Sequence, residues 1–95
     1  MFLINLEYQV GLDVVDQYLV EHRNWLDTLF ADNKLLCSGP KNPRTGGVVI
    51  CLLKDRNEVE ELFKQDPFYI NGVAKFSVTE FILNKYHQAL KPFAD

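Results

Sequence analysis

Cysteine and histidine are scarce in this chain, with two of each among 95 residues. Two cysteines are too few for a disulfide scaffold, and we expect both thiols to be reduced and buried. The chain has neither C-x-x-C nor H-x-x-x-H spacing, and its loop GPKNPRTGG lacks the G-K-[ST] ending of a phosphate-binding loop. We therefore predict no metal site and no cofactor, although Lys41 and Arg44 in that loop are placed to attract an anionic ligand.

The sequence also lacks a basic stripe and a long apolar run. Ten basic and thirteen acidic residues are scattered singly and leave a net charge of -3, which argues against nucleic acid as a partner. The longest apolar runs, such as VVICLL at 48–53, have the length of a strand and fall far short of the roughly 20 residues that span a bilayer. No secretory leader opens the sequence. We expect a cytoplasmic protein with no membrane interaction.

The length and the 47% content of hydrophobic residues predict one domain over residues 1–95. Apolar alternation predicts strands, and apolar spacing of three to four residues predicts helices. The expected order begins with a strand at 1–8, a helix from an Asp13 cap to about 32, a strand at 34–39, a loop at 39–47 and a strand at 48–53. A helix at 55–66, a turn of helix or an irregular corner at 68–72 and a strand at 73–83 follow. The tail at 84–95 is expected to lie on the surface or to cross to a partner.

This order of strand, helix, strand, strand, helix and strand predicts an α+β, ferredoxin-like fold. We expect a four-stranded antiparallel sheet that carries both helices on one face. The other face should then contact water, yet the strands at 2–6 and 48–53 are apolar on both sides. A second copy of the sheet is the simplest cover for such a face. The sequence therefore predicts a homodimer in which two sheets pack face to face.

One residue interrupts the apolar stripe of the first predicted helix, which consists of Val15, Tyr18, Leu19, Leu26, Leu29 and Phe30. In YLVEHRNWLDTLF, the histidine His22 occupies a position where leucine would pack without difficulty. Such a residue is either a core histidine whose ring nitrogens are satisfied by a carbonyl or a tyrosine, or a group that transfers protons near neutral pH. Both alternatives require a hydrogen-bond partner for the ring.

Asp66 is the best candidate for this partner. It lies in KQDPFYING at the end of the second predicted helix, and both helices cover the same face of the sheet. By itself, an Asp-Pro corner is explained by a carboxylate that caps the next turn. If the first helix and this corner meet, however, one contact explains both His22 and Asp66.

A second group of candidates could line a pocket. Ser38, Gly39 and Pro40 end the second predicted strand, which is consistent with a plain turn or with a strand end that opens onto a ligand. Ser38 has no G-x-S-x-G context, so we predict no hydrolase nucleophile. Tyr8 and Phe68 are aromatic residues of the core or walls of the same pocket.

Three segments, EHRNWL, KLLCSGP and KQDPFYINGVAKFSVTEF, together resemble the YciI-like proteins. The resemblance implies a dimeric α/β barrel of ferredoxin-like subunits with a pocket between sheet and helices, near the subunit interface. It also implies a histidine and aspartate pair, which maps to His22 and Asp66, with Ser38, Gly39 and Pro40 as pocket lining. The chain departs from the family pattern at Leu19, where many members have an arginine one turn before the histidine.

Two functions are consistent with these features. The first is a small cofactor-independent enzyme in which His22, oriented by Asp66, moves a proton in an isomerisation or an elimination of HX. The resemblance suggests lactone-like or other small organic substrates, because the family shares its fold with muconolactone isomerases and includes a dehalogenase. The second is a non-catalytic dimer that binds a small organic ligand or a protein partner and uses the same pair as a structural hydrogen bond.

Overall fold

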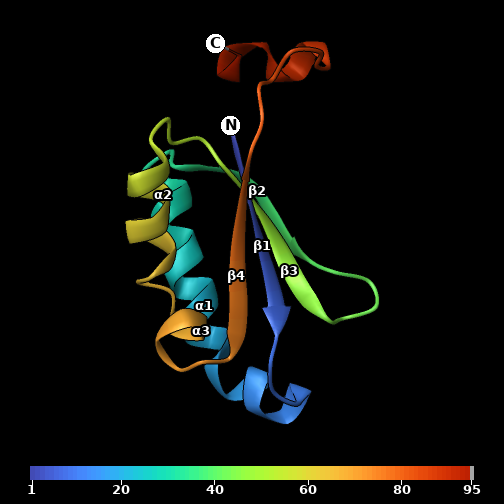
Figure 1. Ribbon diagram of the computed structural model, residues 1–95, viewed down its shortest axis with the longest axis vertical. Helices are drawn as coiled ribbons and strands as arrows, with labels where there is room; N and C mark the ends of the chain where they lie inside the picture. The colour runs from blue at the N-terminus through green and yellow to red at the C-terminus, as the bar shows by residue number, and fades with distance from the viewer. Residues whose placement is uncertain (95) are drawn as a thin grey trace.

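The computed structural model describes residues 1–94; the predicted domain and its tail also include position 95, which lies outside the described residues. The elements follow the predicted order. The corner contains a short helix, one of the two expected forms, and the tail contains a 3-10 helix that was not predicted (Figure 1). They are β1 (Phe2–Tyr8), α1 (Leu12–Ala31), β2 (Leu35–Pro40), β3 (Gly46–Cys51), α2 (Arg56–Phe63), α3 (Pro67–Ile70), β4 (Ala74–Glu80) and the 3-10 helix η1 (Gln88–Phe93).

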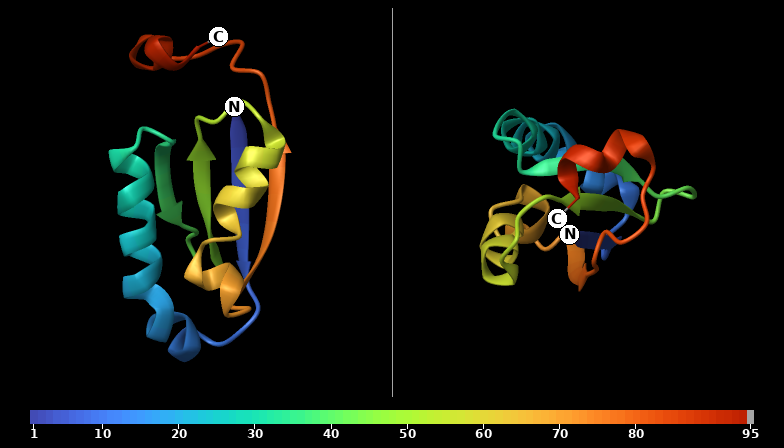
Figure 2. Two further views of the ribbon diagram at one scale, coloured as in Figure 1. Left: turned by 90° about the vertical axis from the view of Figure 1, so that its left-hand side faces the viewer. Right: turned by 90° about the horizontal axis from the view of Figure 1, so that it is seen from above.

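The four strands form one sheet in the order β2-β3-β1-β4, with every neighbouring pair antiparallel. All three α-helices lie on one face of this sheet (Figure 2). The prediction of a ferredoxin-like α+β fold is confirmed by this arrangement. Because β1 lies between β3 and β4, the second half of the chain completes the sheet on both sides of the first strand.

The core lies between the sheet and the helices. Phe2, Ile4 and Leu6 alternate along β1 and are each at most 2% exposed, because alternate residues of a strand point to the same face. On α1, Val15, His22 and Leu29 are the buried positions. Their spacing of seven residues is two helical turns, so the histidine occupies a true core position of the helix.

The ends of α1 agree with its sequence signals in part. The helix begins at Leu12 with Gly11 as its N-cap and no side-chain cap, so the prediction that Asp13 caps it is wrong. Asp13 instead lies in the first turn, where a negative charge is favourable to the helix dipole. At the other end Asn33 has a φ of 58°, which is the left-handed conformation expected after a helix.

The loop predicted at 39–47 is shorter than expected. Gly39 pairs with Val48 and Pro40 with Gly47, so only residues 41–45 connect the two strands. Proline is compatible with β2 because β2 is an edge strand of the sheet. Gly46 also belongs to a strand. No side chain fits at this position, because a Cβ would lie 1.9 Å from the carbonyl oxygen of Leu6.

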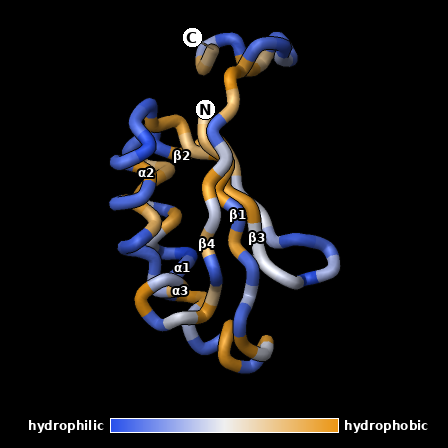
Figure 3. The backbone as a smooth tube through the Cα atoms, in the orientation of Figure 1, coloured by the Kyte–Doolittle hydropathy of each residue, from blue (hydrophilic) through white to orange (hydrophobic). Residues whose placement is uncertain are grey.

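The sheet face opposite the helices carries apolar residues on only part of its area. Leu3 of β1 and both Val48 and Ile50 of β3 are half-buried on this face. On β4 the corresponding positions are Lys75, Ser77 and Thr79, which are exposed. Hydrophobic segments along the strands contrast with the hydrophilic loop between β2 and β3 (Figure 3).

The segment after β4 leaves the sheet. Phe81 pairs with Met1 through two backbone hydrogen bonds of 2.9 Å, and η1 then lies beyond the end of the sheet (Figure 1). Ile82 is 81% exposed and Tyr86 is 42% exposed. The tail therefore contributes apolar surface at the same end of the molecule as the chain's N-terminus.

The two thiols differ in their surroundings, and the prediction that both are buried is wrong for one of them. Cys51 is 0% exposed, whereas Cys37 lies on edge strand β2 and is exposed. Burial raises the pKa of the Cys51 thiol above its ordinary value. Cys51 therefore stays protonated and unreactive at neutral pH.

We expect iodoacetamide at pH 8 to modify one thiol in the folded protein and both in urea, as counted by mass spectrometry. Cys37→Ala should show no modification until it unfolds. The folded state holds the Cys51 proton more tightly than the unfolded chain does. The free energy of unfolding should therefore fall as the pH rises above the ordinary thiol pKa. Rapid modification of Cys51 in the folded Cys37→Ala variant would contradict this assignment.

Candidate functional site

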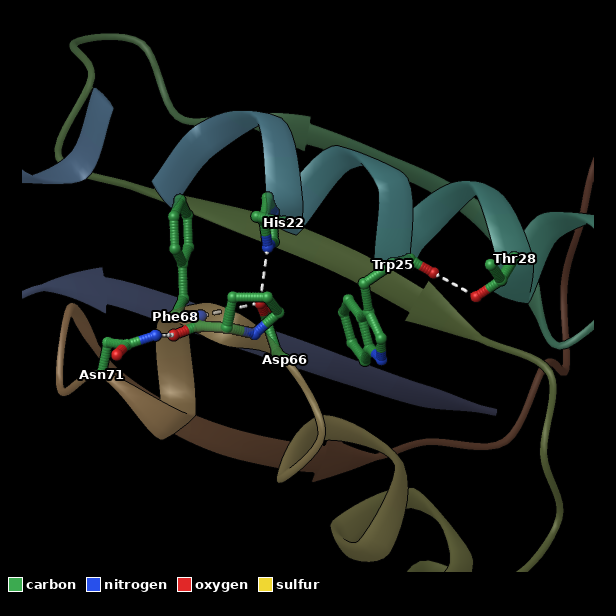
Figure 4. A network of polar contacts seen from close by, with 7 residues as sticks. His22, Trp25, Thr28, Asp66, Phe68 and Asn71 are labelled. Atoms are coloured by element: carbon green, nitrogen blue, oxygen red, sulfur yellow. Dashed lines mark hydrogen bonds and ion pairs between the residues drawn. The ribbon is translucent and has the colours of Figure 1, made fainter. Parts of the chain in front are cut away.

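A histidine and an aspartate from opposite halves of the chain meet in the core. Nδ1 of His22 lies 2.8 Å from Oδ1 of Asp66 (Figure 4). The two residues are 9% and 0% exposed. The predicted contact between the first helix and the corner after the second is therefore present.

Local structure fixes the position of Asp66. Its carboxylate caps α3 by accepting a hydrogen bond of 2.9 Å from the backbone N–H of Phe68, and Pro67 follows at the first helical position, where proline is favoured. The same Oδ1 contacts His22. The two explanations considered for Asp66, helix cap and histidine partner, thus apply to one oxygen atom.

The ring of His22 is held from the side as well. The Phe68 ring stacks on it with centroids 4.0 Å apart and planes 3° apart. Phe68 also touches Tyr8 edge to face at 6.0 Å. One hydrogen bond and one stacking contact thus restrict both the tilt and the rotation of the imidazole.

These contacts define which ring nitrogen is free. Because Oδ1 of Asp66 already accepts the Phe68 N–H, the simplest assignment makes Nδ1–H of His22 a second donor to it. Nε2 of the neutral ring is then the basic nitrogen. Among residues 1–94, no hydrogen bond to Nε2 is present, and the His22 side chain remains 11% exposed.

This side chain borders a cavity of about 360 Å³ between α1 and the edge of the sheet formed by β1, β2 and β3. The volume is within the range of small-molecule sites. The lining is Leu6, Tyr8, Leu19, His22, Arg23, Leu26, Asp27, Phe30, Ser38, Gly39, Pro40, Arg44, Gly47, Val48 and Val49.

The cavity contains most of the predicted site residues. Ser38, Gly39 and Pro40 line it from β2, and Tyr8 lines it from the end of β1. Asp66 and Phe68 are not part of the lining, because both are at most 1% exposed and lie behind the His22 ring. Lys41 is also absent from the lining, whereas Arg44 of the same loop is present.

Three residues of the apolar stripe predicted for α1 line the cavity together with Arg23, which the sequence did not single out. Leu19, Arg23, Leu26 and Phe30 all line the cavity and follow one another at intervals of four, three and four residues. This spacing defines a second helical stripe beside the buried one. Arg23 was not predicted to line a cavity because a charged residue beside an apolar stripe is ordinarily solvated.

Arg44 is the most strongly positioned charge at the cavity. Its Nη2 donates to Oδ1 of Asp16 at 2.6 Å, and Asp16 lies on the second turn of α1. This hydrogen bond, together with one that Arg44 donates to the Tyr8 hydroxyl oxygen, raises the pKa of the Arg44 guanidinium above its ordinary value. The cavity wall thus carries a permanent positive charge.

Within residues 1–94 there is no group of three or more His, Cys, Asp or Glu side chains that could hold a metal ion. The same part of the chain contains no helix with the length and apolarity needed to cross a membrane.

Comparison with known proteins agrees with the fold. The model of the YCII-related domain matches residues 1–82, whereas no curated protein matches the chain. Among solved structures, the chain is similar to 5-chloro-2-hydroxyhydroquinone dehydrochlorinase from Burkholderia phenoliruptrix AC1100 in complex with 2,5-dihydroxybenzoquinone. The sequences are 24% identical, the TM-score is 0.76, and the match covers 93% of this chain and 96% of the other.

Proposed function

The chain belongs to the YCII-related domain family, and from this membership and the geometry of the cavity we propose that it is a small cofactor-independent enzyme. In this proposal His22 is the general acid and base, and Asp66 orients its ring. The substrate is a small organic molecule that undergoes isomerisation or loses HX.

The observation that carries the proposal is the orientation of the His22 ring. Its Nδ1 is engaged by a fully buried carboxyl group, and its side chain borders a cavity of ligand size. A histidine that served packing alone would have no need to face a cavity. A base must be held in one tautomer and one orientation to accept a proton efficiently, and both the hydrogen bond and the Phe68 stack provide this.

The chemical steps follow from this arrangement. Nε2 of His22 removes a proton from a substrate carbon, and the imidazolium that forms is stabilised by Asp66. In an elimination, the electrons of the C–H bond form the new double bond while X leaves as an anion with the electrons of the C–X bond. In an isomerisation, the same proton returns to another substrate atom. Ser38 and the backbone of Gly39 are positioned to hold a substrate oxygen.

The substrate class is supported by the solved structure described above, whose protein removes HCl from a chlorinated hydroxyhydroquinone. A screen of halogenated hydroquinones, halogenated acids and lactones tests the proposal. Halide release and proton exchange with deuterated water should be measured for the wild type and for Asp66→Asn. Turnover by the wild type, reduced in the variant, is expected. Equal rates in both proteins would contradict a catalytic role for the pair.

A second candidate function rests on the dual role of Asp66. Because Oδ1 caps α3 as well as contacting His22, the pair also suits a ligand-binding protein that performs no chemistry. Saturable binding in the cavity without proton exchange on any bound ligand would favour this alternative.

We further propose that the protein is a homodimer that uses the sheet face opposite the helices. Leu3, Val48 and Ile50 form the apolar part of this face, and a second copy would cover it. Sedimentation velocity at micromolar concentration should give a dimer. Val48→Lys, at the centre of the face, should shift the protein towards monomer, whereas Lys75→Gln should not. A wild type that sediments as a stable monomer would contradict the proposal.

The two free cysteines are consistent with a reducing compartment, and we propose the cytoplasm as the location of the protein. The chemistry outlined above needs neither a metal nor an organic cofactor, since proton transfer by an imidazole is sufficient for it.

A further inference from the structure

The loop between β2 and β3 is tied to α1 across one end of the cavity. Arg44 of the loop reaches Asp16 on the helix, and the two side chains are 35% and 55% exposed. The backbone N–H of Tyr8 also bonds to the carbonyl of Thr45 in this loop at 3.0 Å. The guanidinium is therefore held at the cavity wall, close to solvent.

Arg44 keeps most of its hydrogen-bonding capacity for a ligand. A guanidinium has five N–H donors in a planar fork. Asp16 engages the Nη2 group, and Tyr8 accepts one further hydrogen bond. Donors on the fork therefore remain for a planar anionic group such as a carboxylate or an ionised hydroxyl.

A second arginine lines the same cavity. Arg23 follows His22 on α1, and within residues 1–94 it makes no hydrogen bond or ion pair. The acidic residue of the lining is Asp27. Since Asp16 lies outside the lining, the cavity presents two positive charges and one negative charge to its contents.

The remaining walls are apolar. Leu6, Leu19, Leu26 and Phe30 face the cavity together with Val49. Such walls favour a carbon skeleton or ring, whereas a free inorganic anion would gain nothing from them. The combination of apolar walls and guanidinium groups selects an organic anion.

We infer that the cavity binds a small organic anion whose negatively charged oxygen contacts Arg44, and that Asp16 competes with this ligand for the guanidinium. This inference rests on the proposed function, for which it names the charge class of the substrate. Leu19 occupies the position where many family members have an arginine. Arg44 and Arg23 then supply positive charge at other points of the cavity wall. The anion is held at the Arg44 end while its reacting carbon faces His22.

Benzoate and benzamide are suitable probes, because they share a ring and a planar end group and differ in charge. We expect wild-type protein to bind benzoate about tenfold more tightly than benzamide in calorimetric titrations, the difference expected for a hydrogen bond to a charged group. Arg44→Gln should bring this ratio close to one by weakening benzoate only. Asp16→Asn should tighten benzoate by up to about fivefold, which corresponds to the release of an exposed ion pair.

Lys41→Gln is the matched control, because it removes the same charge from the same loop outside the cavity lining. The ratio of benzoate affinity to benzamide affinity in this variant should equal that of the wild type. The inference is overturned if the wild type binds neither probe or binds both equally, if Arg44→Gln keeps the wild-type ratio, or if Asp16→Asn weakens benzoate. His22→Gln should retain the wild-type ratio of benzoate affinity to benzamide affinity. The test of charge selection is therefore independent of whether the protein catalyses a reaction.

Discussion

Asp66→Ala should destabilise the protein by about 2–6 kcal/mol, because each of two buried donors left without an acceptor costs about 1–3 kcal/mol. Asp66 is 0% exposed, and its Oδ1 accepts from both Phe68 N and His22 Nδ1. Alanine leaves both donors buried without an acceptor. Urea denaturation, followed by circular dichroism, gives the change in the free energy of unfolding.

Asp55→Ala is the matched control for this change. Asp55 caps α2 by accepting from Asn57 N at 2.9 Å, in an exposed position and with no histidine partner. Asp55→Ala should lower the free energy of unfolding by about 1 kcal/mol, as expected for loss of an N-cap. Asp66→Asn, which retains an acceptor oxygen, should lie between the two. A cost for Asp66→Ala no larger than that for Asp55→Ala would show that the contact with His22 adds no stability.

His22→Gln should lower kcat by about 10² to 10⁴ for any substrate that the wild type converts, the range associated with loss of a general acid or base. Glutamine offers a donor to Asp66 but cannot take up and release a proton near neutral pH. Because the other side chains that line the cavity are unchanged, KM should change much less than kcat. Initial rates over a range of substrate concentrations separate the two parameters.

The second histidine provides the control for this experiment. His87 lies in the tail, where it caps η1 by accepting from Ala89 N at 3.0 Å, and it is exposed. His87→Gln should therefore retain the wild-type kcat. If the kcat of His22→Gln lies within about threefold of the wild-type value, His22 is excluded as the proton-transfer group, given the range stated above.

Much of the fold could be predicted because hydrophobic periodicity is a local property. The alternation of β1 and the seven-residue spacing of Val15, His22 and Leu29 are readable without any tertiary information. The resemblance to the YciI-like proteins is confirmed by the match to the YCII-related domain. The contact of His22 with Asp66 could also be inferred, because two helices on one face of a sheet bring the first helix close to the corner after the second.

The remaining features depend on neighbours that the sequence does not specify. Gly39 and Pro40 suggested a loop, but an edge strand tolerates proline because one side of its backbone has no partner. The exposure of Cys37 has the same origin, since β2 has one neighbour only. Arg23 could not be assigned to the cavity from the sequence, because a charged residue beside an apolar stripe is ordinarily solvated.

The central position of β1 also has a kinetic consequence. The chain is synthesised from β1 towards β4, yet these two strands are direct neighbours in the sheet, with Phe2 opposite Glu80. Contacts between residues so far apart in the sequence close the largest loops and form slowly. A nascent chain that ends before β4 therefore has β1 paired on one side at most. The sheet that supports His22 and Asp66 is completed only when its last strand has left the ribosome.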